Sequence, residues 1–465
     1  MRQFLLSGVT CLSWAAYAFC APATGPLRPL KNNPRYFTDG SGKAIYLAGS
    51  HNWHNFQDNG HRFPDSQDPP QKFDYSAYLD FLAAHHHNFF RLWRWEAPKW
   101  ADAQPKGMIK YSEPHPWMRT GPGAAHDGKP KFDLTRFNPD YFIRLRDRVA
   151  AARDRGIYVS VMLFEGWELQ FTDAWTYHPF NRANNINDTD ADADGESHGT
   201  VLNTLRYSAL GKRVLALQEA YLRKVVDSVN DLDNVLYEVC NEASGDSTAW
   251  QYYIINYVKE YEAAKPKQHP VGMTYQYRNG ANALLYNSPA DWISPNTGDA
   301  SERFIENPWP ARADKVIVND TDHLWGHTGG DSVWVWKSFT RGLNVLLMEE
   351  LLPSPTWQDS ARTAMGQTRA FAERMNLAEM MPSKELSGTG YCLANHGKEY
   401  LVFQSDKGEF TLNLSDAPGT FSTEWFNITT GATVPGRRVN GGAILTFTTP
   451  FGGPAALYVK LAGSQ

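Results

Sequence analysis

Tyr237-Glu238-Val239-Cys240-Asn241-Glu242 is the most informative segment of this 465-residue sequence. It closes an apolar, strand-like run that starts at Asn234, and a helical pattern follows over residues 247–264. In an eight-stranded parallel barrel, catalytic groups project from the carboxyl ends of the strands. A carboxylic acid beside an amide at such an end suits glycosidic bond cleavage. The acid protonates the leaving oxygen, and the amide hydrogen-bonds a sugar hydroxyl next to the reacting carbon.

Strand and helix patterns alternate on both sides of this stretch, which is typical of βα units around a parallel sheet. Eight apolar runs have the pattern of strands: 44–48, 88–93, 157–163, 235–239, 271–275, 292–294, 316–319 and 345–348. Helical periodicity precedes several of them, at 74–84, 141–153, 214–229, 250–263 and 332–339. The sixth run is the weakest, and without it the later strands shift by one. The sequence therefore predicts an α/β fold, a (β/α)8 TIM barrel.

The pattern changes after a predicted helix at 357–375. Short alternating runs separated by turns follow, at 399–403, 409–414, 421–426, 443–447 and 455–459. Such runs predict a small all-β sandwich. We expect a signal peptide at 1–23, the barrel at 24–383 and the β-sandwich at 384–465. Three long insertions, 96–132, 165–204 and 296–315, follow strand ends and are expected to build a substrate cleft.

Composition and charge narrow the class of partner. Aromatic residues make up 13% of the chain, with 16 Trp and 22 Tyr, and their flat apolar faces with a polar handle suit sugar rings. The net charge of -5 gives no reason to expect nucleic acid or an anionic membrane as a partner. A carbohydrate partner is the expectation, and the oligomeric state stays open.

The N-terminus has the pattern of an export signal. Arg2 precedes a largely apolar run, with cleavage after Cys20 or after Ala23. We expect an exported protein, periplasmic or extracellular, with lipid anchoring at Cys20 as the weaker alternative. The apolar run is too short for a spanning helix, so no integral membrane segment is expected after signal removal.

No metal or cofactor is expected. Beyond the signal only Cys240 and Cys392 remain, without the spacing of a zinc site or a disulfide framework. His85-His86-His87 resembles a metal motif, but consecutive helical residues do not converge on one ion, so it is interpreted as a helix end.

Glycoside hydrolysis uses two carboxyl groups across the scissile bond. Besides Glu242, the seventh run ends in Asp320 and Asp322, which share one face if the strand continues that far. Glu350, at the end of the eighth run, is a third candidate. Polar and aromatic residues at the strand ends are expected to bind and orient the sugar: Asn241, Asp322, His323, His51, Trp53, Arg91, Trp93, Glu165, Trp167, Tyr275 and Glu350.

Several motifs together resemble a known family. They are 34–40 leading to 49–53, Phe89-Phe90-Arg91-Leu92-Trp93, the stretch 237–242, and Asn319-Asp320-Thr321-Asp322-His323. This set resembles the apiosidase-like proteins of the cellulase superfamily, within the clan of retaining (β/α)8 glycosidases. The tail resembles the small β domain, of the collagen-binding type, that follows such barrels.

The resemblance implies that Glu242 is the acid/base and that Asn241 is its partner. The resemblance places Asp320 where the clan has its nucleophilic Glu, and Asp is one methylene shorter than Glu. Asp322 is therefore an alternative nucleophile, and retention of configuration stays open. We expect an exported glycoside hydrolase that cleaves a plant or microbial polysaccharide or oligosaccharide. The alternative is a non-catalytic carbohydrate-binding or adhesion protein on an inactive barrel.

Overall fold

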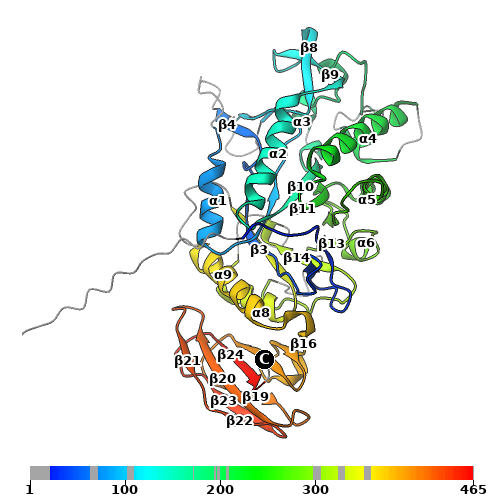
Figure 1. The fold of residues 1–465 in the computed structure, drawn as a ribbon. Coiled ribbons are helices and arrows are strands. Elements are labelled where there is room, and N and C mark those ends of the chain that lie inside the picture. The colour runs from blue at the N-terminus through cyan, green and yellow to red at the C-terminus, as the bar shows by residue number, and fades with distance from the viewer. Residues whose placement is uncertain are drawn as a thin grey trace, which may run out of the picture.

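The computed structural model describes residues 21–62, 72–101, 109–170, 172–192, 195, 199–205, 209–296, 305–322, 330–349 and 358–463. Two predicted site residues, His323 and Glu350, lie outside these ranges, as do residues 1–20 of the predicted signal peptide. The fold has two parts, a barrel surrounded by helices and a β domain packed against one side of it (Figure 1).

Eight parallel strands form the barrel: β3 (Ala48–Asn52), β5 (Phe89–Leu92), β10 (Tyr158–Glu165), β11 (Val235–Asn241), β12 (Val271–Thr274), β13 (Trp292–Ser294), β14 (Val316–Asp320) and β15 (Asn344–Glu349). They are ordered β3-β15-β14-β13-β12-β11-β10-β5. The end strands meet where the Asn88 backbone N–H donates to the Ala48 carbonyl at 2.9 Å, so the sheet nearly closes on itself. The predicted TIM barrel is confirmed, including its weakest strand, β13.

The first barrel strand is displaced from its predicted place. The apolar pattern predicts 44–48, but β3 spans Ala48–Asn52, and Ile45 instead pairs with Phe37 in an isolated antiparallel bridge. Gly49 explains why this less apolar segment takes the barrel position. A Cβ at Gly49 would lie 1.9 Å from the Phe89 carbonyl oxygen, so only glycine permits this approach to the neighbouring strand.

Helices cover the outside of the barrel (Figure 1). The α-helices are α1 (Tyr75–Ala84), α2 (Pro139–Arg153), α3 (Thr172–Tyr177), α4 (Ala209–Val229), α5 (Thr248–Ala263), α6 (Asn282–Tyr286), α8 (Ser332–Thr340) and α9 (Asp359–Arg374). Single 3-10 turns are η1 (Glu168–Gln170), η2 (Arg182–Asn184), η3 (Thr200–Asn203), η4 (Gly245–Ser247), η6 (Leu377–Glu379) and η7 (Lys384–Leu386). Local chemistry sets their starts: at α2, the Asn138 side chain accepts from the Asp140 N–H and Pro139 stands at the first position. Among the described residues, no helix has the length and apolar character needed to cross a membrane.

The insertion after β5 contains strands that the sequence pattern did not predict. In it, β6 (Lys99–Ala101) and β7 (Ile109–Glu113) join β4 (Asp58–Arg62) in a three-stranded sheet. The hairpin of β8 (Trp117–Ala124) and β9 (Pro130–Phe137) follows and extends beyond the helices (Figure 1). A separate antiparallel pair, β1 (Arg28–Pro29) and β2 (Phe37–Thr38), precedes the barrel.

The C-terminal part is an antiparallel β domain, as predicted. Its larger sheet contains β16 (Met381–Pro382), β17 (Cys392–Asn395), β18 (Glu399–Gln404), β24 (Ala455–Leu461), β20 (Thr420–Asn427), β21 (Thr433–Pro435) and β22 (Val439–Asn440). A second sheet pairs β19 (Glu409–Asn413) with β23 (Ile444–Thr448). The two share one core, where Phe410 meets Trp425 at 5.9 Å between ring centroids. The five predicted runs are strands, whereas β16, β17, β21 and β22 were missed; the domain boundaries at 23 and 383 stay a prediction.

The barrel and the β domain share an apolar interface. Trp336 of α8 is fully buried and stacks on Phe403 of β18 at 6.0 Å between ring centroids. Its ring also lies 5.8 Å from Phe426 of β20 and 5.3 Å from Phe371 of α9. The β domain therefore completes the core around α8 and α9.

Replacing Trp336 by Ala is expected to destabilise the protein by about 3–5 kcal/mol, because a large buried side chain leaves a cavity that relaxes only in part. Urea unfolding followed by circular dichroism measures this. Ile444→Ala is the control, because Ile444 is 61% exposed and its loss should change the stability by less than about 0.5 kcal/mol. A loss below about 1 kcal/mol for Trp336→Ala would show that this stack does not hold the two parts together.

Candidate active site

Arg91 of β5 organises the carboxyl end of the barrel. It is 1% exposed, and its guanidinium donates to both oxygens of Glu238 on β11, with Nε to Oε2 at 2.8 Å and Nη2 to Oε1 at 2.5 Å. Nη1 donates to Asp320 Oδ2 at 2.6 Å, and Nη2 also donates to Asn241 Oδ1 at 2.7 Å. Burial alone lowers the pKa of Arg91, but the charges of Glu238 and Asp320 outweigh it and raise the pKa. A permanent cation is thus fixed between two carboxylates.

Glu238 was missed as a site residue, although it lies within the informative segment 237–242. Its side chain is fully buried and points from the middle of β11 to Arg91. A charged residue inside an apolar strand was the available signal, because a buried charge needs a partner of opposite sign.

Asp320 ends β14 and is fully buried. Besides Arg91 on Oδ2, its Oδ1 accepts from the Asp322 backbone N–H at 3.0 Å and lies 3.6 Å from His51 Nε2. Burial lowers the pKa of His51, although the charge of Asp320 acts in the opposite direction. The His51 ring stacks on Trp93 at 5.6 Å, and the Arg91 guanidinium lies 4.8 Å from the Trp93 ring centroid. Five predicted site residues, Asp320, Arg91, Asp322, His51 and Trp93, therefore lie together here.

Glu242 directly follows β11 and is partly buried. Its φ of 40° lies in the left-handed region, which for a residue other than glycine costs on the order of 1–3 kcal/mol and clusters at functional sites. Gln170 Nε2 donates to the Glu242 carbonyl at 2.9 Å and so supports this conformation. Burial and then the charge of Glu165 raise the pKa of Glu242 to about 7, with a further contribution from Asp320, while Arg91 acts against them.

Asp322 lies next to these groups and is 8% exposed. Its Oδ2 is 3.9 Å from Arg91 Nη1. Burial and the charges of Glu242 and Asp320 raise the pKa of Asp322 well above its usual range. Glu238 and Asp320 are therefore bound directly to Arg91, whereas the pKa values of the neighbouring Glu242 and Asp322 carboxyl groups are raised.

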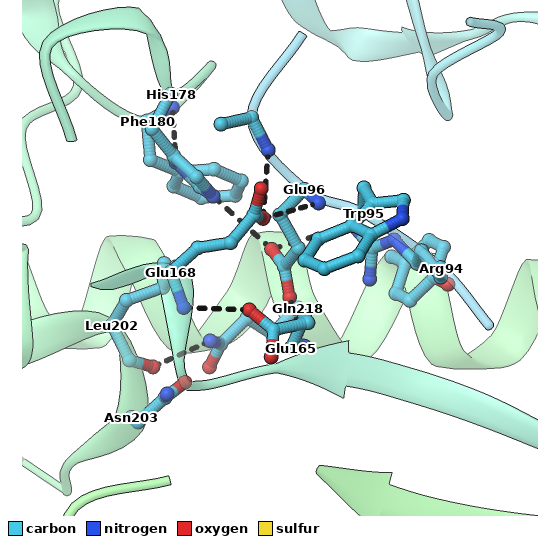
Figure 2. Close-up of polar contacts among 12 residues, drawn as sticks. Arg94, Trp95, Glu96, Glu165, Glu168, His178, Phe180, Leu202, Asn203 and Gln218 are labelled. Carbon is cyan, nitrogen blue, oxygen red and sulfur yellow. Dashed lines mark hydrogen bonds and ion pairs between the residues drawn. The ribbon is translucent and has the colours of Figure 1, made fainter. Parts of the chain in front are cut away.

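Glu165 ends β10 and is fully buried. It is paired with Asn241 of the neighbouring strand β11. Its Oε1 accepts from Asn241 Nδ2 at 3.0 Å. Glu165 belongs to a cluster of buried polar residues that includes Arg94, Glu96, Glu168 and His178 (Figure 2).

Of the other members of this cluster, Arg94 and Glu96 stand at the end of the second predicted strand but were assigned no role, and Glu168 and His178 were not predicted. Glu96 Oε2 lies 3.1 Å from His178 Nε2 and 3.4 Å from Arg94 Nη2. Although burial acts against ionisation, Arg94 and His178 lower the pKa of Glu96. Burial raises the pKa of Glu168 to about 8. Among the described residues, no group of three or more His, Cys, Asp or Glu is arranged to hold a metal ion.

The remaining predicted residues lie at the edge of this arrangement. Trp53 and Trp167 are partly buried and pack on a cluster that includes Trp93, Trp95 and Trp100. Tyr275 follows β12, and its hydroxyl donates to the Gly280 carbonyl at 3.0 Å, which ties it to its own loop. His323 and Glu350 fall outside the described residues.

Comparison with known proteins identifies relatives of the fold. A family model described as a domain of unknown function, DUF6298, matches residues 101–289, less than half of the chain. A glycoside hydrolase family 5 protein from Bacteroides vulgatus superposes with a TM-score of 0.61 at 12% identity, covering 96% of both chains. A second structure, described as a glycoside hydrolase, gives a TM-score of 0.58 at 11% identity and covers 95% of this chain and 98% of its own. No curated protein sequence matches.

These matches carry no statement about an apiosidase or a collagen-binding domain, so that part of the resemblance stays a prediction. At 11–12% identity the similarity concerns the fold and not the activity. The chain has the (β/α)8 barrel fold, followed by a β domain, of structures described as glycoside hydrolases.

Proposed function

We propose that this protein is an exported glycoside hydrolase that cleaves a plant or microbial polysaccharide or oligosaccharide. One observation carries the proposal: Glu242, whose pKa is raised to about 7 by burial and by neighbouring charges that include Asp320, follows β11 at the same carboxyl end of the barrel where Asp320 ends β14 and accepts from Arg91. Glycosidic cleavage uses two such carboxyl groups, one of raised pKa as the acid and a second one as the nucleophile. Export rests on the N-terminal sequence pattern alone.

In the proposed mechanism, Glu242 donates its proton to the leaving oxygen as the glycosidic bond breaks. Asp320 attacks the anomeric carbon, and Arg91 and the Asp322 backbone N–H donate to its carboxylate and orient it. Glu242, now ionised, then removes a proton from water, which attacks the anomeric carbon and releases Asp320. Two displacements give net retention of configuration.

Asp320 and Asp322 are distinguished by their contact with Arg91. Asp320 bonds directly to Arg91, whereas Asp322 is farther from this cation and its pKa is raised by burial and by the neighbouring carboxyl groups. A nucleophile must be ionised, which favours Asp320. We assign Asp322 to hydrogen bonding of the substrate in its neutral form. The partly buried rings of Trp53 and Trp167 are suited to stack on sugar rings.

The first test is a screen of the purified mature protein against aryl glycosides and against plant and microbial polysaccharides, with Glu242→Gln in parallel. Release of reducing sugar by the wild-type protein alone would support the hydrolase and the role of Glu242. Binding without release, equal in the two proteins, would reject it. If neither turnover nor binding occurs, the panel is extended to other sugars and linkages before the mechanism is judged.

The pH dependence of kcat/KM is expected to fall on the alkaline side with an apparent pKa of about 7. Glu242 must be protonated to act as the acid, and the protonated fraction drops about tenfold per pH unit above that value. A pH–rate profile of the free enzyme with an activated and an unactivated substrate measures this. An alkaline limb set by a group near pH 4.5 would contradict the assignment of Glu242 as the acid.

A second candidate function is favoured by the burial of Asp320. Its side chain is fully covered, and both oxygens already have partners in Arg91, Asp322 and His51. Such a carboxylate could serve the structure alone, in a non-catalytic carbohydrate-binding or adhesion protein. That function predicts sugar binding without turnover, with affinity unchanged in Glu242→Gln.

A further inference from the structure

We infer that Glu165 is a positioning residue that fixes the amide of Asn241 in one orientation. The amide lies between a cationic donor and a carboxyl acceptor: its oxygen accepts from Arg91 Nη2 at 2.7 Å, and its nitrogen donates to Glu165 Oε1 at 3.0 Å. Turning the amide over would place N–H against the guanidinium and oxygen against the carboxyl group. The bond to Arg91 would be lost and an N–H would face a buried cation, which makes the reversed orientation costly. The inference rests on the proposed function of this site and refines it.

Glu165 is itself held by its own loop. Its Oε1 also accepts from the Trp167 backbone N–H at 3.1 Å, and its Oε2 accepts from the Glu168 backbone N–H at 2.7 Å. The Glu165 side chain is fully buried, and both of its carboxyl oxygens accept hydrogen bonds. It is therefore held in one orientation. Asn241 is thus oriented by a group that is itself fixed, as preorganised sites require.

The neighbouring carboxylates fix the backbone on which Glu165 stands. Glu96 Oε1 accepts from the Glu165 backbone N–H at 2.8 Å (Figure 2). Glu168 Oε2 accepts from the backbone N–H groups of Glu96 at 2.7 Å and of Ala97 at 3.1 Å. The loops after β5 and β10 are therefore locked together behind Asn241, and Glu165 is the member of the cluster that contacts it.

The consequence for the reaction follows from amide chemistry. An amide nitrogen carries two hydrogens, so after the bond to Glu165 a second one remains to be donated. With its orientation fixed, Asn241 offers that hydrogen to a sugar hydroxyl next to the reacting carbon. Such a hydrogen bond strengthens in the transition state of glycoside hydrolysis. Glu165 therefore acts through Asn241 rather than by touching the sugar, which differs from the substrate contact predicted from sequence.

Glu165→Met tests the inference, because Met has a similar volume and removes the acceptor. The substrates are an aryl glycoside of the sugar that the wild-type protein hydrolyses and its 2-deoxy counterpart. For the parent glycoside we expect kcat/KM to fall on the order of 10- to 100-fold. For the 2-deoxy glycoside, which lacks the hydroxyl, we expect a fall of less than about threefold. Equal losses on the two substrates would overturn the inference and make Glu165 a structural residue.

Glu262→Met is the matched control. Glu262 is also a buried Glu with side-chain bonds, to His269 Nδ1 at 2.8 Å and to Asn230 Nδ2 at 2.8 Å, but it lies at the end of α5, away from the strand ends that carry the site. This variant should lose stability without distinguishing the two substrates. If it showed the same substrate difference, the effect of Glu165→Met would be unspecific.

Glu165→Asp decides the matter if Glu165→Met does not fold. Asp keeps an acceptor for the loop N–H groups but is one methylene shorter, so the reach to Asn241 is lost. The same difference between parent and 2-deoxy glycoside is expected, and its absence in a folded Glu165→Asp protein would overturn the inference. A wild-type protein that hydrolyses no glycoside would instead reject the proposed function, so the two failures are distinct.

Discussion

Replacing Glu242 by Gln is expected to lower kcat/KM on an unactivated glycoside by about 10²–10⁴-fold, the usual contribution of a general acid. Gln has nearly the same shape, so it keeps the packing around residue 242. It also adds no backbone strain, because Glu242 already occupies the left-handed region at φ 40°. The loss should therefore be chemical, and the melting temperature should stay close to that of the wild-type protein.

The leaving group gives this prediction a second readout. A phenol of low pKa leaves without a proton, so its aryl glycoside should lose far less in the first step than a polysaccharide does. Asp246→Asn is the matched control, since Asp246 is an exposed carboxylate four residues further along the same loop and should retain full activity. If Glu242→Gln keeps more than about one third of the activity on unactivated substrates, Glu242 is not the acid.

The barrel could be predicted because its strands are buried on both faces and so form continuous apolar runs. All seven residues of β11 and all eight of β10 are buried, and both were found from their pattern. The displaced strand, β3, shows the limit of that signal. Its sequence Ala-Gly-Ser-His-Asn lacks large apolar residues, and its place is decided by the close approach of Gly49 to Phe89.

The catalytic candidates could be predicted because they occur at strand ends, a local feature of the sequence. Their partners could not. Arg91 and Glu238 are 147 positions apart, and Glu96 and His178 are 82 apart. Which buried charges pair is decided by the barrel order and by the loops that cross its rim, and neither leaves a periodic pattern in the sequence. The pairing within the cluster of Arg94, Glu96, Glu165, Glu168 and His178 therefore becomes visible only in the structure.

Replacing Asp320 by Ala is expected to reduce turnover on the order of 10³- to 10⁵-fold, because the covalent route loses its nucleophile. The matched variant, Asp322→Ala, should lose much less, on the order of 10- to 100-fold, because we assign Asp322 to substrate binding. Both changes remove a buried carboxyl group near Arg91. Differences in stability are therefore measured alongside, by thermal unfolding of each variant.

Azide identifies the nucleophile independently of the size of these losses. In Asp320→Ala, azide can enter the space left by the carboxylate and attack an activated aryl glycoside once, which gives a glycosyl azide of inverted configuration. In Glu242→Ala, azide instead attacks the glycosyl-enzyme intermediate and gives the retained configuration, since the nucleophile is still present. Proton NMR of the products distinguishes the two. An inverted azide from Asp322→Ala and none from Asp320→Ala would transfer the nucleophile to Asp322, because the group whose removal admits azide to the anomeric carbon is the one that occupied that position.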